Sequence, residues 1–171
     1  MGRVSKKELL LDAAEKILEN GASSDLSLDR IAEVSGISKG GLLYHFPTKD
    51  SVLIAMVERL IQRFDDEFDR LVEKGGADFK SIYFVVNTNP QIIKSARGLM
   101  AASNYNPQIL EPLRKAYARW DKILFDQFKD QKEAWQFRLL FDGFFFCALL
   151  DLPLPSKKDL KAIVESFETG K

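Results

Sequence analysis

Residues 27–50 read SLDRIAEVSGISKGGLLYHFPTKD, and this stretch decides the fold of the N-terminal part of the chain. A serine precedes each of two short apolar patterns, which predicts two capped helices over 28–35 and 39–46. Gly36 lies between them and suits a left-handed turn, and Pro47 ends the second helix. The pattern therefore predicts two short helices joined by a tight glycine turn.

The side chains of this stretch also suit a close helix crossing. Ala32 is small where the two helices would meet. Ile31, Ile37 and Leu42 can then close a small core. A helix-turn-helix that reads DNA has these requirements. A helical hairpin that serves only as a scaffold is the alternative.

Helical spacing continues on both sides of the motif. A helix is predicted over 5–20, with Gly21 after it, and a long one over 49–73, followed by the linker Lys74-Gly75-Gly76. Residues 82–86 have strand propensity, but no nearby segment could pair with them, so we interpret them as helix. Further helices are predicted over 78–87, 90–103, 107–129, 132–150 and 157–168.

The predicted fold class is therefore all-α, with a three-helix, helix-turn-helix DNA-binding domain before a C-terminal helical bundle. The domain boundaries follow the motif: residues 1–47 form the DNA-binding domain, and residues 48–171 form an effector-binding and dimerisation domain. Helix 48–73 connects the two.

Composition excludes several other classes of protein. Lys plus Arg and Asp plus Glu both number 25, so a DNA-binding face must be a local basic patch on a neutral chain. A single cysteine cannot form an internal disulfide, one cysteine and one histidine cannot form a common zinc site, and no cofactor or metal is predicted. No Gly-rich phosphate loop occurs, so an enzyme is not favoured. Neither a signal peptide nor a membrane span is predicted, and we expect a cytoplasmic protein.

The predicted DNA face combines side chains that can bind phosphate with two glycines, Gly40 and Gly41, at which the backbone could approach DNA closely. Lys39 and Lys49 each lie at a helix N-terminus, where free backbone N–H groups also attract phosphate. Tyr44 can donate to a phosphate or a base edge, and His45 either does the same or packs inward beside Phe46. The full predicted set is Ser27, Ser38, Lys39, Gly40, Gly41, Tyr44, His45, Thr48 and Lys49.

Residues 5–60 resemble the tetracycline-repressor (TetR) family of regulators. The resemblance rests on Leu28-x-x-Ile31-Ala32-x-x-Ser35-Gly36-Ile37-Ser38-Lys39-Gly40, followed by Tyr44-His45-Phe46-Pro47-x-Lys49. It implies a homodimer on a palindromic operator, usually a repressor released by a small molecule. Members of the family often have an aromatic residue where this chain has Leu43.

The resemblance also implies a ligand pocket in the C-terminal domain. We expect a small, largely apolar ligand held by one or two hydrogen bonds. A plain aromatic core is the alternative. The acidic stretch Asp65-Asp66-Glu67 is interpreted as a solvated face. The predicted pocket residues are Phe64, Phe68, Arg97, Met100, Asn104, Tyr105, Tyr117, Trp120 and Phe141.

The same resemblance places the last two long helices in a dimer interface. Gly143 interrupts an apolar helix, which favours the close approach of another helix, either in a second copy or in the same chain. The predicted interface residues are Asp142, Gly143, Phe145, Leu149, Ile163 and Phe167. A helical protein-interaction module that binds neither DNA nor ligand is the alternative function.

Overall fold

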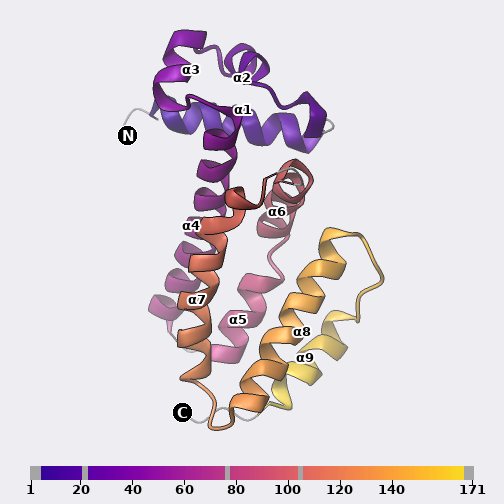
Figure 1. Cartoon of the computed structure of the whole chain (residues 1–171). Helices are drawn as coiled ribbons and strands as arrows, with labels where there is room; N and C mark the ends of the chain where they lie inside the picture. Colours follow the sequence, from indigo (N-terminus) through magenta and orange to yellow (C-terminus); the bar gives the residue numbers. More distant parts are fainter. Residues whose placement is uncertain (1–4, 21–22, 76–77, 104–105, 168–171) are drawn as a thin grey trace. The chain divides into compact units, whose positions relative to one another are not determined.

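A computed structural model describes residues 5–20, 23–75, 78–103 and 106–167. These residues form α-helices and short 3₁₀ turns and contain no strand (Figure 1). The predicted all-α fold class is confirmed, and residues 82–86 are helical as expected. Gly21, Gly76, Asn104 and Tyr105 lie outside the described residues, so the predictions made for them are not addressed.

The helices begin and end close to the predicted residues. The first five elements are α1 (Lys6–Asn20), η1 (Ser23–Asp25), α2 (Leu28–Ser35), α3 (Lys39–His45) and α4 (Lys49–Lys74). The others are α5 (Phe79–Asn87), α6 (Pro90–Ser103), η2 (Pro107–Leu110), α7 (Glu111–Phe125), α8 (Gln131–Leu149) and α9 (Lys157–Glu165).

The helix predicted over 107–129 is the main departure. It begins as the 3₁₀ turn η2 and ends as an α-helix at Phe125. The backbone N–H of Phe128 bonds to the carbonyl of Phe125 at 3.2 Å, a tighter i→i−3 bond. This turn directs Phe128 into the core, where its side chain is buried. The α-helix therefore ends three residues before the last buried apolar side chain of this segment.

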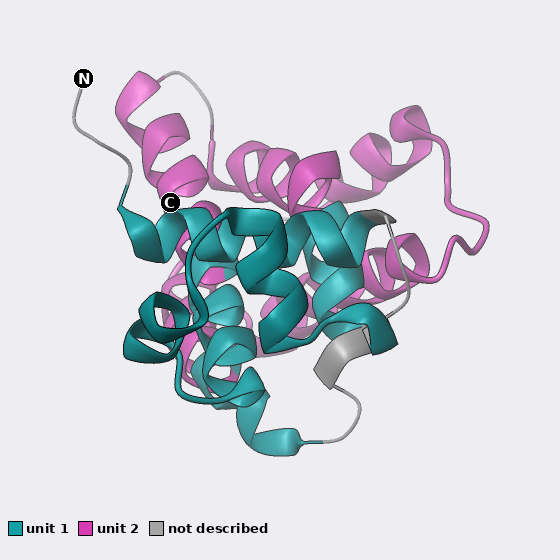
Figure 2. Ribbon diagram, turned by 90° about the horizontal axis from the view of Figure 1, so that it is seen from above, with its two compact units in different colours: residues 1–60, 94–113 teal, residues 61–93, 114–171 magenta. Residues whose placement is uncertain are grey.

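The chain divides into two compact units, which are coloured separately in Figure 2. Unit 1 comprises residues 1–60 and 94–113, and unit 2 comprises residues 61–93 and 114–171. Helix α4 therefore contributes to both units. The predicted division at residue 47 follows the helix-turn-helix motif instead and stays a prediction about function.

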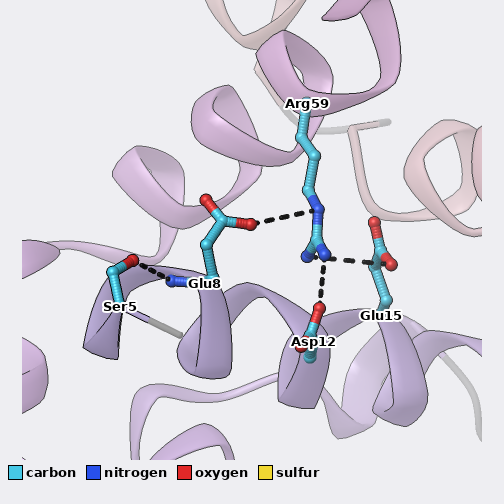
Figure 3. A network of polar contacts seen from close by, with 5 residues as sticks. All are labelled: Ser5, Glu8, Asp12, Glu15 and Arg59. Atoms are coloured by element: carbon cyan, nitrogen blue, oxygen red, sulfur yellow. Dashed lines mark hydrogen bonds and ion pairs between the residues drawn. The ribbon is translucent and has the colours of Figure 1, made fainter. Parts of the chain in front are cut away.

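In unit 1, an ionic cluster fastens α4 to α1. Arg59 of α4 faces Glu8, Asp12 and Glu15, which share one face of α1 (Figure 3). The guanidinium bonds to Asp12 and lies 3.6 Å from Glu8 and 3.9 Å from Glu15. Burial by itself lowers the pKa of Arg59, but the hydrogen bond to Asp12 and the three negative charges outweigh it and raise the pKa.

Helix α6 also packs closely on α1 within unit 1. A Cβ atom at Gly98 would lie 3.0 Å from the Cβ of Leu18, so a larger residue would fit here only if the neighbouring helix shifted. Lys94 pairs with Glu19 at 3.0 Å beside the same contact.

Unit 2 is built around aromatic rings. Phe137 is fully buried, and its ring lies 5.1–5.3 Å from the rings of Tyr83, Phe128, Phe141 and Phe167. Helix α5 packs against both α8 and α9 around this cluster. Many aromatic residues of the C-terminal half therefore form the hydrophobic core of unit 2.

Candidate nucleic-acid interface and effector cavity

Three hydroxyl groups cap the helices of the helix-turn-helix. Ser27 accepts from the N–H of Arg30 at 3.2 Å, and Ser38 accepts from that of Gly41 at 3.2 Å. Thr48 accepts from the N–H of Ser51 at 3.1 Å. Each hydroxyl uses a lone pair for its cap, so its O–H can still donate to a phosphate.

The turn between α2 and α3 has the predicted geometry. Gly36 adopts a left-handed φ of 68°, and its N–H bonds to the carbonyl of Glu33 at 3.3 Å. Ile31 and Leu42 are fully buried on the two sides of the turn. Two of the three residues predicted for the small core are therefore buried, and the third, Ile37, is half-buried.

Helix α3 presents a prominent outer face. Tyr44 is 85% exposed, and the neighbouring Leu43 is also exposed, which the sequence did not indicate. Gly40 is exposed, with nothing within 4 Å of where a Cβ would lie. His45 is half-buried, with its ring edge-on to that of Tyr44. Its ring is therefore partly covered by the protein and partly open to solvent, which is compatible with both predicted roles.

The two predicted lysine anchors differ in their surroundings. Lys39 is exposed and forms a 2.7 Å ion pair with Asp29 of α2. A phosphate that binds Lys39 must therefore compete with this carboxylate. Lys49 is half-buried at the first position of α4.

Gly41 has less room than the sequence suggested. A Cβ there would lie 3.1 Å from the Cγ2 of Ile37 and 3.3 Å from the capping oxygen of Ser38. A bulky residue at Gly41 would therefore disturb the start of α3 as well as its outer face. The open position Gly40 tests groove entry more cleanly.

A cavity of about 320 Å³ lies within unit 2, between α4, α5 and α7. Three of the predicted pocket residues line it: Phe64, Phe68 and Trp120. The other lining residues are Gln62, Asp65, Asp69, Phe79, Tyr83, Arg119 and Ile123.

Four other predicted pocket residues do not line this cavity, and Asn104 and Tyr105 lie outside the described residues. Phe141 is buried in the aromatic core of unit 2, and the hydroxyl of Tyr117 donates to Asp142 at 3.1 Å. Arg97 and Met100 belong to unit 1. Helical spacing could not show which ring faces would remain uncovered.

The interpretation of Asp65 as part of a solvated face is wrong. Asp65 is half-buried and lines the cavity, where one oxygen accepts from the indole N–H of Trp120 at 2.7 Å and the other pairs with Arg119. Its spacing of three residues from Phe68 and four from Asp69 was the available signal. Acids at i and i+4 beside aromatic residues share that part of a helix surface.

The predicted interface residues have mixed positions. Leu149 is buried, Phe167 packs against Phe137, and Asp142 binds Tyr117 within its own unit. Gly143 and Ile163 are exposed, and Phe145 is half-buried. The most exposed apolar side chains of α8 are three others: Leu139, Phe146 and Leu150, the last being its C-cap.

Together, the helix-turn-helix and a separate helical unit with its own cavity define a DNA-binding transcriptional regulator of two parts. Residues 10–56 match the family described as "Bacterial regulatory proteins, tetR family", and residues 83–169 match "Tetracyclin repressor-like, C-terminal domain". The chain belongs to the TetR family, a family of transcriptional regulators and not of enzymes.

Individual proteins support this assignment. The chain is 34% identical over 73 residues to the regulator EthR of Mycolicibacterium smegmatis, an alignment that covers 43% of this chain and 34% of that protein. The aligned segment thus spans about a third of the length of the curated relative. Whole-chain similarity appears in solved structures, at identities that show the fold alone.

A transcriptional regulator from Rhodococcus sp. Rha1 has a TM-score of 0.74 and 20% identity, covering 95% of this chain and 96% of its own. The flavonoid-responsive regulator FrrA has a TM-score of 0.65 and 16% identity, covering 94% of this chain and 92% of its own. Among the described residues, no helix is both long enough and apolar enough to cross a bilayer.

Proposed function

We propose that this TetR-family regulator binds a palindromic operator as a homodimer, represses transcription there, and is released by a small, largely apolar ligand. The observation that carries the DNA-binding part is the outer face of α3, where Tyr44 projects beside the open edge at Gly40. We expect the protein to act in the cytoplasm, where such an operator is accessible.

The DNA contacts divide into anchors and readers. Lys39, Lys49 and the capping hydroxyls would bind phosphates, and Tyr44 would lie at the groove. Asp29 holds Lys39 in the free protein, so Asp29→Asn should strengthen binding to all sequences. A fluorescence-anisotropy titration checks this, and weaker or unchanged binding would contradict the role given to Lys39.

Paired substitutions at the two glycines separate groove entry from folding. Gly40→Leu adds a side chain to open space and should abolish operator binding with little change in the melting temperature. Gly41→Ala places a Cβ 3.1 Å from Ile37 and 3.3 Å from the cap oxygen of Ser38, so it measures how the start of α3 tolerates a side chain at the crowded position. Normal DNA affinity in a folded Gly40→Leu variant would show that this edge does not enter the groove.

An exposed apolar surface supports the homodimer. Leu139, Phe146 and Leu150 are each more than half exposed at spacings of seven and four residues, and Ile163 of α9 is 41% exposed. Gly143 falls between the first two, with open space where a Cβ would be, so a second helix could approach closely. Apolar rows of this kind mark interaction surfaces, and a two-fold dimer would cover the same row on both copies.

This row revises the predicted interface, because it replaces the buried Leu149 and the core-packed Phe167 by residues that are more than half exposed. Phe146→Glu should convert the dimer into a monomer in light scattering. Val72→Glu, at an exposed site on α4, is the matched control. In the dimer, two recognition helices would need to lie about 34 Å apart to meet successive turns of DNA. A wild-type monomer at micromolar concentration that still binds the operator tightly would contradict the proposal.

Helix α4 offers a route from ligand to DNA. It begins at the anchor Lys49 and continues to Phe64 and Phe68 in the cavity wall. A ligand that binds better when this segment is displaced would favour the arrangement that cannot bind DNA. The name of FrrA describes that protein as responsive to flavonoids, and it supports a regulator of this fold that responds to a small molecule.

A compound panel tests the release step. Compounds that raise the melting temperature should also release the operator in a mobility-shift assay. If no compound loosens DNA binding, the regulator works without an effector. If no DNA is selected from a genomic library, the chain is a helical protein-interaction module instead.

A further inference from the structure

The cavity of unit 2 has walls made largely of aromatic rings. Phe64 and Trp120 stack with their centroids 4.4 Å apart. The ring of Phe79 lies 6.0 Å from that of Phe68 and 5.7 Å from that of Tyr83. The face of an aromatic ring attracts a cation within about 6 Å of the centroid. Rings that leave a cavity between them can therefore receive a positive group as well as an apolar one.

Carboxylates outnumber cations among the lining residues. Asp65 and Asp69 lie one turn apart on α4, and Arg119 is the one cation among the residues that line the cavity. Arg119 pairs with Asp65, whose other oxygen binds the indole of Trp120. Within the described part of the chain, Asp69 has no ion pair, so one negative charge at the cavity is left without a partner.

Tyr83 brings a further polar group to the cavity. Its side chain is 8% exposed and lines the cavity, and its hydroxyl makes no hydrogen bond with any described residue. Burial raises the pKa of this hydroxyl well above its usual value, and the negative charge of Asp142 raises it further, while Arg138 acts in the opposite direction. The neutral phenol is thus retained, and its oxygen can accept a hydrogen bond from a ligand N–H.

We propose that the cavity takes an organic cation: an ammonium or amidinium group on a small apolar body. The body would lie against the rings of Phe64, Phe68 and Trp120, and the positive charge would lie near Asp69. The inference rests on the proposed function, because it names the chemical class of the effector expected there. An anion would be repelled by the negative charge of Asp69, and a neutral apolar compound would have no electrostatic attraction to it.

Three probes that share a benzyl group test the charge preference. They are the cation benzyltrimethylammonium, its uncharged isostere neopentylbenzene and the anion phenylmethanesulfonate. Trp120 reports on the cavity, and Trp135→Phe removes the only other tryptophan. In the full-length Trp135→Phe protein, we expect the cation to quench Trp120 with about tenfold higher affinity than the isostere. Equal or tighter binding of the isostere or the anion would overturn the inference.

Substitutions at Asp69 test the assigned partner. Asp69 is exposed and bonds to no described residue, so its replacement should leave the fold intact. Asp69→Asn should weaken the cation by about three- to tenfold and leave the isostere unchanged, and Asp69→Lys should abolish cation binding. Glu73→Gln makes the same charge change at an exposed site on α4 outside the cavity and should change nothing. Unchanged cation affinity in both Asp69 variants would overturn the assignment.

Operator release is measured separately from binding, so the two proposals can fail independently. Cation binding without release supports the cation site and overturns effector control. Release by neutral compounds, with no preference for the cation, supports effector control and overturns the cation site.

Discussion

Each compact unit contains an arginine surrounded by carboxylates, but the two clusters are built differently. In unit 1, Arg59 meets acids that all belong to α1 (Figure 3). In unit 2, Arg138 of α8 pairs with Asp121 of α7 at 2.6 Å and with Asp142 of its own helix at 3.3 Å. Its guanidinium also lies 5.0 Å from the ring centroid of Tyr117.

The arginines are equally covered, but their partners are not. The side chains of Arg59 and Arg138 are 19% and 17% exposed. Asp12 and Glu8 are 52% and 47% exposed and Glu15 is 18% exposed, whereas Asp121 is 25% and Asp142 is 31% exposed. If the arginine is lost, water can therefore reach two of the three carboxylates in unit 1 more readily than the two carboxylates in unit 2. The comparison therefore concerns the two ion clusters and not the cores, since both units also bury apolar side chains.

The largest expected effect is the loss of a core ring in unit 2. Phe137→Ala removes a fully buried ring with four ring neighbours and should lower the free energy of unfolding by about 3–5 kcal/mol. Phe68→Ala, in the cavity wall, should cost about 1–2 kcal/mol, because its ring already borders open space. Urea unfolding followed by circular dichroism measures both, and equal losses would contradict the distinction between core and cavity.

Loss of the arginine should also destabilise the cluster of unit 2 more than the cluster of unit 1. Arg138→Met leaves two covered carboxylates without their cation and should cost about 3 kcal/mol. Arg59→Met should cost about 1–2 kcal/mol, since water reaches Asp12 and Glu8. Arg70→Met, at an exposed pair with Glu67, is the control and should change stability little. A larger loss at Arg59 than at Arg138 would reverse the comparison.

Phosphate anchoring should belong to unit 1 alone. Lys39→Ala and Lys49→Ala should each reduce the slope of log K against log salt by about 0.9, because each removes one phosphate contact. Lys157→Ala makes the same change at an exposed site in unit 2 and should leave the slope unchanged. Unchanged slopes in both unit 1 variants would show that Lys39 and Lys49 do not contact phosphates.

The smallest expected effect is a pH dependence in unit 2. Burial raises the pKa of Asp142, against the opposing effects of Arg138 and the hydroxyl of Tyr117. A carboxyl with a raised folded-state pKa destabilises the fold as pH rises through the interval between its unfolded and folded values. Asp142→Asn does not ionise, so its stability relative to the wild type should increase as pH rises from about 4 upward. Urea unfolding across this range checks the sign, and a relative decrease would contradict it.

Local rules determined most of the fold in advance. The caps at Ser27 and Ser38 and the left-handed turn at Gly36 act within one helical turn, so the sequence specifies them directly. Helical periodicity likewise places Glu8 and Asp12 on one face of α1. The family motif between residues 27 and 50 then indicates a DNA-binding regulator.

Only the tertiary structure decided which partners those faces meet. The sequence contains no signal that Arg59 reaches the acids of α1, because its position depends on how α4 packs 47 residues after Asp12. The cavity depends in the same way on which rings of three helices remain uncovered, and it turned Asp65 from a presumed surface acid into a lining residue. Helix α8 is apolar around most of its circumference, so periodicity could not show that Phe146 faces outward while Leu149 is buried. Caps and turns are settled by neighbours along the chain, whereas exposure is settled by helices that are distant in sequence.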